Sequence, residues 1–401
     1  MATLSRSVCT RHFRTFYSVC KNEQLNSVMR RANLNPSRSF SGNSVTPRPV
    51  TAQGNLIVYA LGGIAAGVAY RVWEVKSKDF SPVSNNSVSK PKILNELPPY
   101  PPARKVSIPT DNSGLHLVLY QYPTCPFCCK VRAFLDYNGL SYDVVEVDPV
   151  LRTQTKWSDY RKVPILLAGI GEGKYVQLND STAIISILES FLSDRKQNLL
   201  DIVNCYPSLS YRDNDGSIKS EIQNRYFLMS GDDGRKGRSK EDIMDEVKWR
   251  EWADKKLVHV LSPNVYRTTE EALQSFEWFS EVGEWDRLFP SWERNLIVYV
   301  GAYAMWLIGK RLKKRHLLKD EVRLSLYDEL NVWIKQLKKK GTKFSGGSKP
   351  NLSDLAVFGV LSSIEGCQAF KDALENTNIG NWFYDMKKHA TQHAGSNPIG
   401  I

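Results

Sequence analysis

Three cysteines, Cys125, Cys128 and Cys129, lie within five residues of one another in the stretch TCPFCCK. Thiols at this spacing can exchange disulfides, contribute to a metal site, or hold a small thiol substrate. A structural zinc site needs four ligands, and no second C-x-x-C or close histidine pair lies near this cluster. His389 and His393 have a suitable spacing but lie far along the chain. We therefore expect no metal site, and the surrounding residues must decide between the other two functions.

The cluster follows an apolar run and opens an amphipathic stretch, so we predict that Cys125 lies at the N-terminus of a helix. Unsatisfied N–H groups and the helix dipole favour a thiolate there. Pro126 suits the first helical turn because that turn needs no N–H from it. Cys128, one turn on, can resolve a mixed disulfide formed at Cys125, whereas Cys129 points off this face and is expected to pack. Cys125 is thus the predicted reactive thiol, with Cys128 in second place.

Further candidate site residues are expected to surround Cys125. Val163–Pro164 begins a predicted strand, where a cis-proline would leave the backbone of Val163 free to pair with a thiol peptide, and a trans-proline is the alternative. Asp180–Ser181 opens a helix whose N–H groups could hold a carboxylate of glutathione, although ordinary capping explains the same residues. Tyr122 is three residues before Cys125 and either hydrogen-bonds a thiolate or substrate, or belongs to the core.

The apolar pattern predicts the elements that position these residues. Buried strands are expected at 115–122 and 141–148, a helix at 126–138, a strand pair at 163–169 and 174–178, and a closing helix at 180–192. This order is the thioredoxin-like arrangement. Residues 205–245 contain Gly-rich, charged stretches and are interpreted as a linker or exposed loops.

The remainder of the chain has a helical period. Helices are predicted at 243–261, 268–281, 291–315, 319–339, 352–375 and 381–394. The apolar run at 296–309 is too short to span a bilayer, so we interpret it as the central buried helix of an all-α domain.

The net charge of +12 is concentrated near the start of the chain. Residues 1–48 contain eight Lys or Arg and one acid, which leaves +5 for the other 353 residues and argues against a nucleic-acid partner. A segment rich in Arg and Ser and poor in acids is typical of an organellar transit peptide. We expect mitochondrial import, with chloroplast import and an untargeted basic tail as the alternatives.

The segment that follows the predicted transit peptide is apolar. No charged residue lies between positions 49 and 70, and a bilayer core needs about 20 apolar residues, so residues 55–73 predict one membrane anchor. A buried helix is the alternative.

The expected organisation is a transit peptide (1–48), an anchor (55–73), a linker (74–112), a thioredoxin/glutaredoxin-like domain (113–200), a linker with loops (201–245) and an all-α domain (246–395). The predicted location is a mitochondrial membrane, spanned once.

Several stretches, among them LYQYPTCPFCCKVRAFLDY, YRKVPILLA, QLNDSTAIIS and KPNLSDLAVFGVL, closely resemble the prostaglandin E synthase type 2 family. The resemblance implies a glutaredoxin-like domain joined to an all-α domain like that of glutathione transferases, behind a membrane anchor. PNLSD, with Asn351 and Asp354, also looks like the capping box of the transferase α-domain. Cys129 and the stretch GDDGRKGRSKED look unlike the animal members.

The same resemblance implies an activity and its residues. It implies an isomerase that converts the lipid endoperoxide prostaglandin H2 to prostaglandin E2, with Cys125 as the essential thiol and Tyr122 as its hydrogen-bond partner. Glutathione contacts are implied at Val163, Asp180 and Ser181. Bound haem and a homodimer formed through the α-domain are implied as well.

Two other functions stay open from the residues alone. A glutathione-dependent thiol–disulfide oxidoreductase or a glutathione transferase would use the same cleft, the former with Cys128 as the resolving thiol. A non-catalytic glutathione- or haem-binding module would need no reactive thiol at the cluster.

Overall fold

The computed structural model describes residues 87–212, 218–229 and 238–396. The predicted transit peptide and membrane anchor lie outside the described residues. Across the described ranges, no helix combines the length and apolar character needed to cross a bilayer. Of the described residues, those at 87, 210–212 and 218–220 belong to one compact unit and all others to a second.

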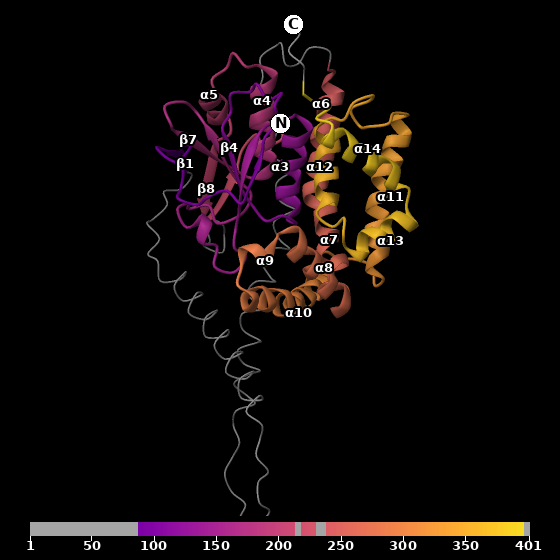
Figure 1. Ribbon diagram of the computed structural model, residues 1–401. Coiled ribbons are helices and arrows are strands. Elements are labelled where there is room, and N and C mark those ends of the chain that lie inside the picture. Colours follow the sequence, from indigo (N-terminus) through magenta and orange to yellow (C-terminus); the bar gives the residue numbers. More distant parts are fainter. Residues whose placement is uncertain (1–86, 213–217, 230–237, 397–401) are drawn as a thin grey trace, which may run out of the picture. The chain divides into compact units, whose positions relative to one another are not determined.

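A six-stranded sheet forms the centre of the N-terminal part of the second unit (Figure 1). Its strands, in the spatial order β2-β7-β6-β4-β5-β3, are β2 (Ile93–Leu94), β7 (Tyr175–Asn179), β6 (Ile165–Gly169), β4 (Leu117–Gln121), β5 (Tyr142–Glu146) and β3 (Arg104–Val106). Strands β4 and β5 run parallel and all other neighbours are antiparallel. This is the predicted thioredoxin-like topology, with short strands added at both edges.

Helices of this part cover the sheet and complete the strand–helix alternation. The helices are α3 (Pro126–Tyr137), α4 (Ser181–Ser193) and α5 (Leu199–Asn204), with a 3₁₀ turn at Thr153–Thr155. Strand β4 alternates, because Leu117 and Leu119 join the main core with α3 whereas Val118 and Tyr120 join a smaller cluster. Gly139, with φ +66°, follows the end of α3, where a residue with a side chain would be strained.

The predicted linker at 201–245 contains elements that we did not predict. Strands β8 (Ser208–Arg212) and β9 (Ile218–Ile222) lie in it and form a second sheet with β1 (Ser87–Ser89), in the order β1-β8-β9. The short helix α5 begins just before this range and ends within it. Gly-rich and charged composition therefore did not exclude short paired strands here.

The C-terminal part is helical, as predicted. It comprises α6 (Lys240–Trp252), a π-helical segment (Ala253–Leu257), α7 (Val258–Val265), α8 (Thr269–Val282), α9 (Trp285–Leu288), α10 (Ser291–Arg315), α11 (Val322–Lys340), α12 (Leu352–Ser362), α13 (Gln368–Asn376) and α14 (Ile379–Thr391). The predicted capping box is present: Asn351 accepts the N–H of Asp354, and the Asp354 carboxylate accepts the N–H of Asn351. Burial of that carboxylate raises its pKa to about 6.

The prediction of one helix at 352–375 is wrong, because the chain turns between α12 and α13. Gly366 lies in this turn, and a Cβ there would lie 2.2 Å from the ring of Trp278. The indole of Trp278 on α8 packs directly against the backbone of the turn. Close packing of a large ring requires a glycine at this point.

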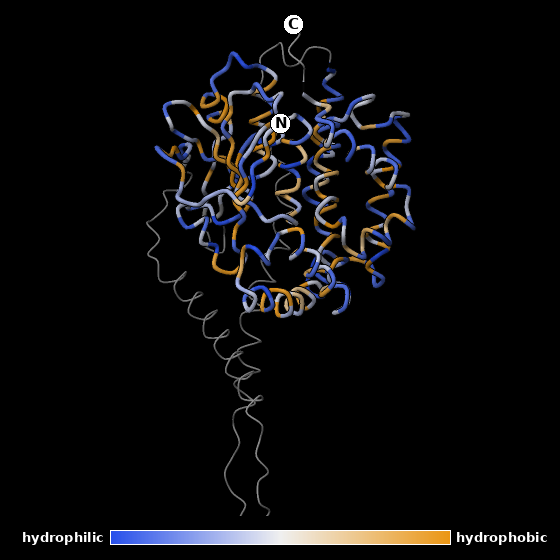
Figure 2. The backbone as a smooth tube through the Cα atoms, in the orientation of Figure 1, coloured by the Kyte–Doolittle hydropathy of each residue, from blue (hydrophilic) through white to orange (hydrophobic). Residues whose placement is uncertain are grey.

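The prediction that residues 296–309 form a central buried helix is also wrong. Helix α10 begins and ends as predicted, but only a narrow stripe of it is buried, at Ile297, Val298, Ala302 and Gly309. In Figure 2 this helix lies below the other described elements and is coloured in a mixture of orange, white and blue. Its neighbours α7, α8 and α9 contact one side of it and leave the other side to solvent.

The helical part packs against the sheet domain mainly through α12 and α3, which contact each other more extensively than any other pair of elements. Gly359 of α12 lies against the backbone of Lys130, and a Cβ at position 359 would be 2.5 Å from the Lys130 Cα. The two helices therefore approach more closely than side chains at this point would allow. This contact fixes the helical part beside the N-terminal half of α3.

Candidate functional site

Cys125 is the N-cap residue of α3, as the sequence predicts. Strand β4 ends at Gln121, and the chain turns so that the N–H of Cys125 donates to the carbonyl of Tyr122, with N and O 3.2 Å apart. The Cys125 carbonyl accepts the N–H of Cys129 and begins the helical ladder. Pro126 occupies the first helical position. The Cys125 thiol is half-buried and free of disulfides.

The electrostatic surroundings separate the pKa values of Cys125 and Cys128. A hydrogen bond from the Cys128 thiol lowers the pKa of Cys125 against the effect of burial, and the N–H groups of Cys128 and Phe127 lower it further. Burial raises the pKa of Cys128 well above its ordinary value, since that side chain has no exposed surface. Cys125 is therefore the thiol that ionises, and Cys128 stays protonated beside it.

Cys129 packs, as expected from its place on the helix. Its thiol donates to the Pro123 carbonyl at 3.3 Å and lies 3.1 Å from Nη2 of Arg132. Burial raises the pKa of the Cys129 thiol to about 11, although the Arg132 charge opposes this rise. A buried, protonated thiol of this kind is unreactive.

The strand register brings the three predicted segments to one edge of the sheet. Ile165 of β6 pairs with Tyr120 of β4, so Pro164 lies opposite the end of β4 that leads to Cys125. Ile165 also pairs with Asn179 of β7, so Asp180 follows at the same edge. The Val163–Pro164 peptide bond is cis. The geometry thus gathers Tyr122, Cys125, Val163–Pro164 and Asp180–Ser181 at one edge of the sheet.

Tyr122 and Tyr160 are two phenols at this edge, and both pack on the smaller cluster with Val163. Burial raises the pKa of Tyr122 despite the nearby Arg152 charge, so the phenol is neutral at physiological pH. Burial also raises the pKa of Tyr160 to about 12, and the N–H of Asp180 partly offsets it by hydrogen bonding to the phenol oxygen. The charge of Cys125 contributes to the rise of both pKa values. Tyr160 was missed because no spacing in the sequence links it to Cys125.

Asp180 is the N-cap of α4. Its Oδ1 accepts the N–H groups of Thr182 and Ala183 at 2.9 and 3.2 Å, and its backbone has φ +65°. Its Oδ2 lies 3.1 Å from Nη1 of Arg225. The Asp180 carboxylate is thus occupied by capping and by an ion pair. Among the described residues, the N–H of Ser181 makes no hydrogen bond, and Ser181 is 4% exposed.

A buried ion pair connects this edge to the helical part. Nζ of Lys130 donates to Asp254 and, at 2.8 Å, to the Thr182 hydroxyl, which donates in turn to Asp254 at 2.7 Å. Lys130 is 1% exposed, and its charge lowers the pKa of Asp254 against the effect of burial. Because Thr182 belongs to the first turn of α4, this network holds that turn in place.

The described histidines do not gather at the thiol. His116 lies beside Gly169, His259 stacks on His316, His389 contacts Phe344, and His393 hydrogen-bonds the Asp136 carbonyl. Within the described ranges, no group of three or more His, Cys, Asp or Glu side chains could hold a metal ion.

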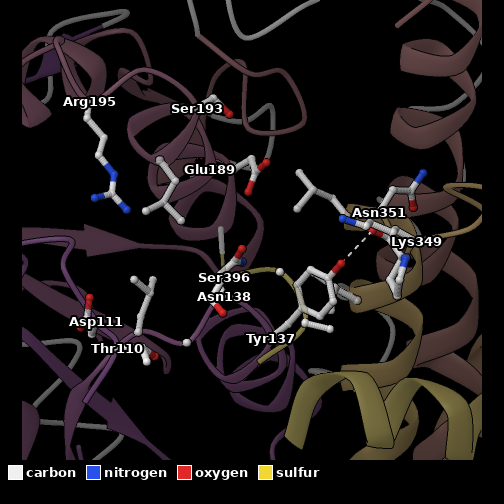
Figure 3. A pocket seen from close by; sticks show the side chains of 18 of the residues that line it. Thr110, Asp111, Tyr137, Asn138, Glu189, Ser193, Arg195, Lys349, Asn351 and Ser396 are labelled. Carbon is white, nitrogen blue, oxygen red and sulfur yellow. Dashed lines mark hydrogen bonds between the residues drawn. The ribbon is translucent and has the colours of Figure 1, made fainter. Parts of the chain in front are cut away.

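A polar cavity of about 350 Å³ lies at the other end of α3, where Tyr137 and Asn138 form part of its wall (Figure 3). The Glu189 side chain of α4 points into it. Burial and the nearby charge of Glu246 raise the pKa of Glu189 to about 7. Since α3 is roughly 18 Å long, this cavity is separate from the thiol.

Comparison with known proteins agrees with this architecture. Residues 119–194 match the family described as "Glutathione S-transferase, N-terminal domain". Among solved structures, glutathione transferase F7 from Populus trichocarpa is 14% identical, covering 70% of this chain and 99% of that chain, with a TM-score of 0.39. The family match at residues 119–194, together with the strand order and the helices that follow, gives the chain a glutathione-transferase-like fold with a thioredoxin-like sheet domain and a helical C-terminal part.

Two curated relatives define the family more narrowly. Prostaglandin E synthase 2 of Danio rerio is 47% identical over 294 residues, which cover 73% of this chain and 75% of the relative. Prostaglandin E synthase 2 of Mus musculus is 47% identical over 283 residues, covering 70% and 72%. The chain belongs to the prostaglandin E synthase 2 family. The expected enzyme type, an isomerase on a glutaredoxin/GST-like fold, is confirmed by this membership.

Proposed function

We propose that this chain is a membrane-associated prostaglandin E synthase that isomerises prostaglandin H2 to prostaglandin E2 with the Cys125 thiol and bound glutathione. The observation that carries the proposal is the half-buried Cys125 thiol at the N-terminus of α3, with a lowered pKa. Family membership supports the substrate, and the cysteine environment supports the chemistry.

The isomerisation needs a base and an acid at one place. A thiolate at Cys125 removes the proton from the carbon that becomes the ketone, the C–H electron pair forms the C=O bond, and the O–O bond breaks. The departing oxygen takes a proton and becomes the hydroxyl group. A neutral Tyr122 phenol, or the protonated Cys128, can donate that proton because burial raises the pKa of both. Proton return from Cys125 restores the starting state, so no oxidant or reductant is consumed.

Glutathione is proposed to lie along the same edge of the sheet. The backbone of Val163, beside cis Pro164, would pair with the peptide, and the first turn of α4 would hold an α-carboxylate. The Ser181 N–H supports this position. The Asp180 carboxylate already caps α4 and pairs with Arg225, so its proposed part is to orient the turn and to accept an ammonium group at its rim.

Haem belongs to the proposal only through family resemblance. The described histidines make their contacts elsewhere, so the structure offers haem no axial histidine near Cys125. Haem iron also accepts thiolate ligands, so the Cys125 thiolate or the sulfur of bound glutathione would be the candidate ligand, and no step above uses haem.

The cellular setting completes the proposal. Residues 55–73 would anchor the chain in a membrane, residues 1–48 would direct it to mitochondria, with chloroplasts as the alternative, and two copies would form a homodimer. These parts rest on sequence pattern and resemblance.

The test is turnover of prostaglandin H2 by the full-length chain and its Cys125→Ser variant, with prostaglandin E2 measured by mass spectrometry. We expect loss of at least ~100-fold in rate, the range of general acid–base contributions. Cys205→Ser, which removes an exposed thiol outside the site, is the matched control and should keep full activity. Undiminished turnover in Cys125→Ser excludes the proposed role of the thiol.

A thiol–disulfide oxidoreductase is the second candidate, favoured by the hydrogen bond between Cys128 and Cys125. Cys128→Ser should impair reduction of protein disulfides while sparing reactions that need one thiol. Turnover of a glutathione mixed disulfide without turnover of prostaglandin H2 would favour this candidate. Glutathione binding with neither turnover would favour the non-catalytic module.

A further inference from the structure

Helix α10 exposes an unusually apolar face. Seven large apolar side chains on it are exposed: Trp292, Leu296, Tyr299, Val300, Tyr303, Leu307 and Ile308. Five of them, at positions 292, 296, 299, 303 and 307, recur every three or four residues and form one stripe along the helix, with Val300 and Ile308 beside it. Trp292, Tyr299 and Tyr303 are 70%, 60% and 58% exposed, which is far from the burial expected of large aromatic residues.

Packing on the opposite side fixes the direction of this stripe. A Cβ at Gly301 would lie 2.6 Å from the Phe276 ring of α8, and one at Gly309 would lie 3.3 Å from the Tyr266 carbonyl after α7. These close approaches seat α10 firmly on α7 and α8. The apolar stripe therefore faces outward because the helix cannot rotate, not because the helix is loosely held.

Basic residues continue the same face towards the helix C-terminus. Arg311 and Lys314 follow Leu307 at helical spacing and are exposed. Between positions 294 and 319 the chain has seven Lys or Arg and no acid. Three of the seven form ion pairs with aspartates outside this range: Arg294 with Asp286, Lys313 with Asp320 and Lys319 with Asp328. Nζ of Lys310 lies 3.6 Å from the centre of the Trp306 ring, so a cation contacts an aromatic ring where the apolar stretch of α10 ends and its basic stretch begins.

This combination favours one class of partner. Tryptophan and tyrosine concentrate at membrane–water interfaces, and basic residues beside an apolar helical face add attraction to anionic lipids. A second copy of α10 would bring the same excess of positive charge, with Glu293 as its one acidic side chain in the helix. Charge complementarity therefore favours an anionic surface over a self-pairing helix.

We propose that the exposed face of α10 docks on an anionic lipid surface, lying parallel to the membrane. The helix has 25 residues and is roughly 37 Å long, and its charged end prevents it from spanning a bilayer. The aromatic side chains enter the headgroup region, and Arg311 and Lys314 contact lipid phosphates. This contact is distinct from the anchor proposed at residues 55–73 and presents the folded part to the membrane along a defined face.

The test is hydroxyl-radical footprinting of the full-length chain in vesicles, read residue by residue by mass spectrometry. One set of vesicles contains phosphatidylcholine alone and the other also contains phosphatidylglycerol. Tyr299 and Tyr303 should be labelled several-fold more slowly with the anionic lipid, and high salt should reverse this protection. Tyr384 on α14, at 52% exposure, is the matched tyrosine and should be labelled equally in both.

A charge variant separates lipid contact from other causes. The double substitution Arg311→Glu and Lys314→Glu should remove the protection of Tyr299 and Tyr303, while circular dichroism and Tyr384 labelling stay unchanged. If the protection of Tyr299 and Tyr303 is equal in both kinds of vesicle and rises with the number of protein molecules per vesicle, a second copy covers the helix and the proposal is overturned. Full labelling of both tyrosines in anionic vesicles would overturn it as well.

Discussion

The Arg225 guanidinium and the Asp180 carboxylate form an ion pair at the N-terminus of α4, with Nη1 and Oδ2 3.1 Å apart. The other carboxylate oxygen of Asp180 caps the helix, and the residue has a positive φ of 65°. An aspartate tolerates this conformation when its side chain is held locally. Arg225 therefore stabilises the turn at which the proposed glutathione carboxylate would meet the Ser181 N–H.

Replacing Arg225 with Met should weaken glutathione binding modestly. The pair is partly exposed, so its loss is expected to cost about 0.2–1 kcal/mol, or a rise in Kd of at most about fivefold. Isothermal titration with glutathione measures this change. Arg195→Met removes an arginine at the distant cavity and should leave Kd unchanged. An unaltered Kd in Arg225→Met would show that the ion pair does not support the binding turn.

Cys125 should react with iodoacetamide at a lower pH than an ordinary thiol. The hydrogen bonds from the Cys128 thiol and from the first N–H groups of α3 stabilise the thiolate, so its pKa is lowered. Labelling is measured at each cysteine by mass spectrometry across a pH series. Cys128 should stay unlabelled because it is buried and its pKa is raised. Modification of Cys128 before Cys125 would reverse the assignment of the two thiols.

The sequence predicted the thioredoxin-like part well because its signals are local. Local residues set the ends of α3: Cys125 is its N-cap, Pro126 is its first residue, and Gly139 follows its end. In the same way, Asp180 is the N-cap residue that begins α4. The sheet edge that joins Cys125, Pro164 and Asp180 follows from strand order once the topology is recognised. These features depend on residues that are near in sequence or on one known arrangement of strands.

Tertiary contacts account for what the sequence did not predict. Arg225 is 45 residues from Asp180, and Asp254 is 124 residues from Lys130, so no spacing reveals either pair. The error at α10 has another cause. A helix that is apolar on all sides is buried only when neighbours surround it, and packing partners are present on one side.

Gly359→Ala should destabilise the protein by about 1–3 kcal/mol, as overpacking does. A Cβ at this position would lie 2.5 Å from the Cα and 2.7 Å from the N of Lys130, and backbone atoms cannot move aside without separating α12 from α3. Denaturant unfolding measures the loss.

Gly380→Ala is the control for that substitution. It also lies in a helix, but the added Cβ would meet only the Leu374 Cδ2, at 3.3 Å, and a side-chain end can shift. Its stability should be unchanged or raised, because alanine is the better helix former. Equal stability of Gly359→Ala and the wild type would show that the α3–α12 contact can relax.

Glu189→Gln should change how stability depends on pH. The folded pKa of Glu189 is about 7, above its ordinary value of 4.5, because burial and the Glu246 charge disfavour the carboxylate. A raised pKa means that the folded state holds the proton more tightly than the unfolded state does. The stability from this group is therefore complete below the unfolded pKa and is lost as pH rises through the folded pKa.

Glutamine keeps the shape of the side chain and cannot ionise, so the variant should escape this loss. We expect it to exceed the wild type by on the order of 1–3 kcal/mol at about pH 8, and by much less at about pH 5. Denaturant unfolding at both pH values measures the difference, and Glu96→Gln, at an exposed position, should show none. A gain that is the same at both pH values would indicate altered packing rather than the removal of a buried charge.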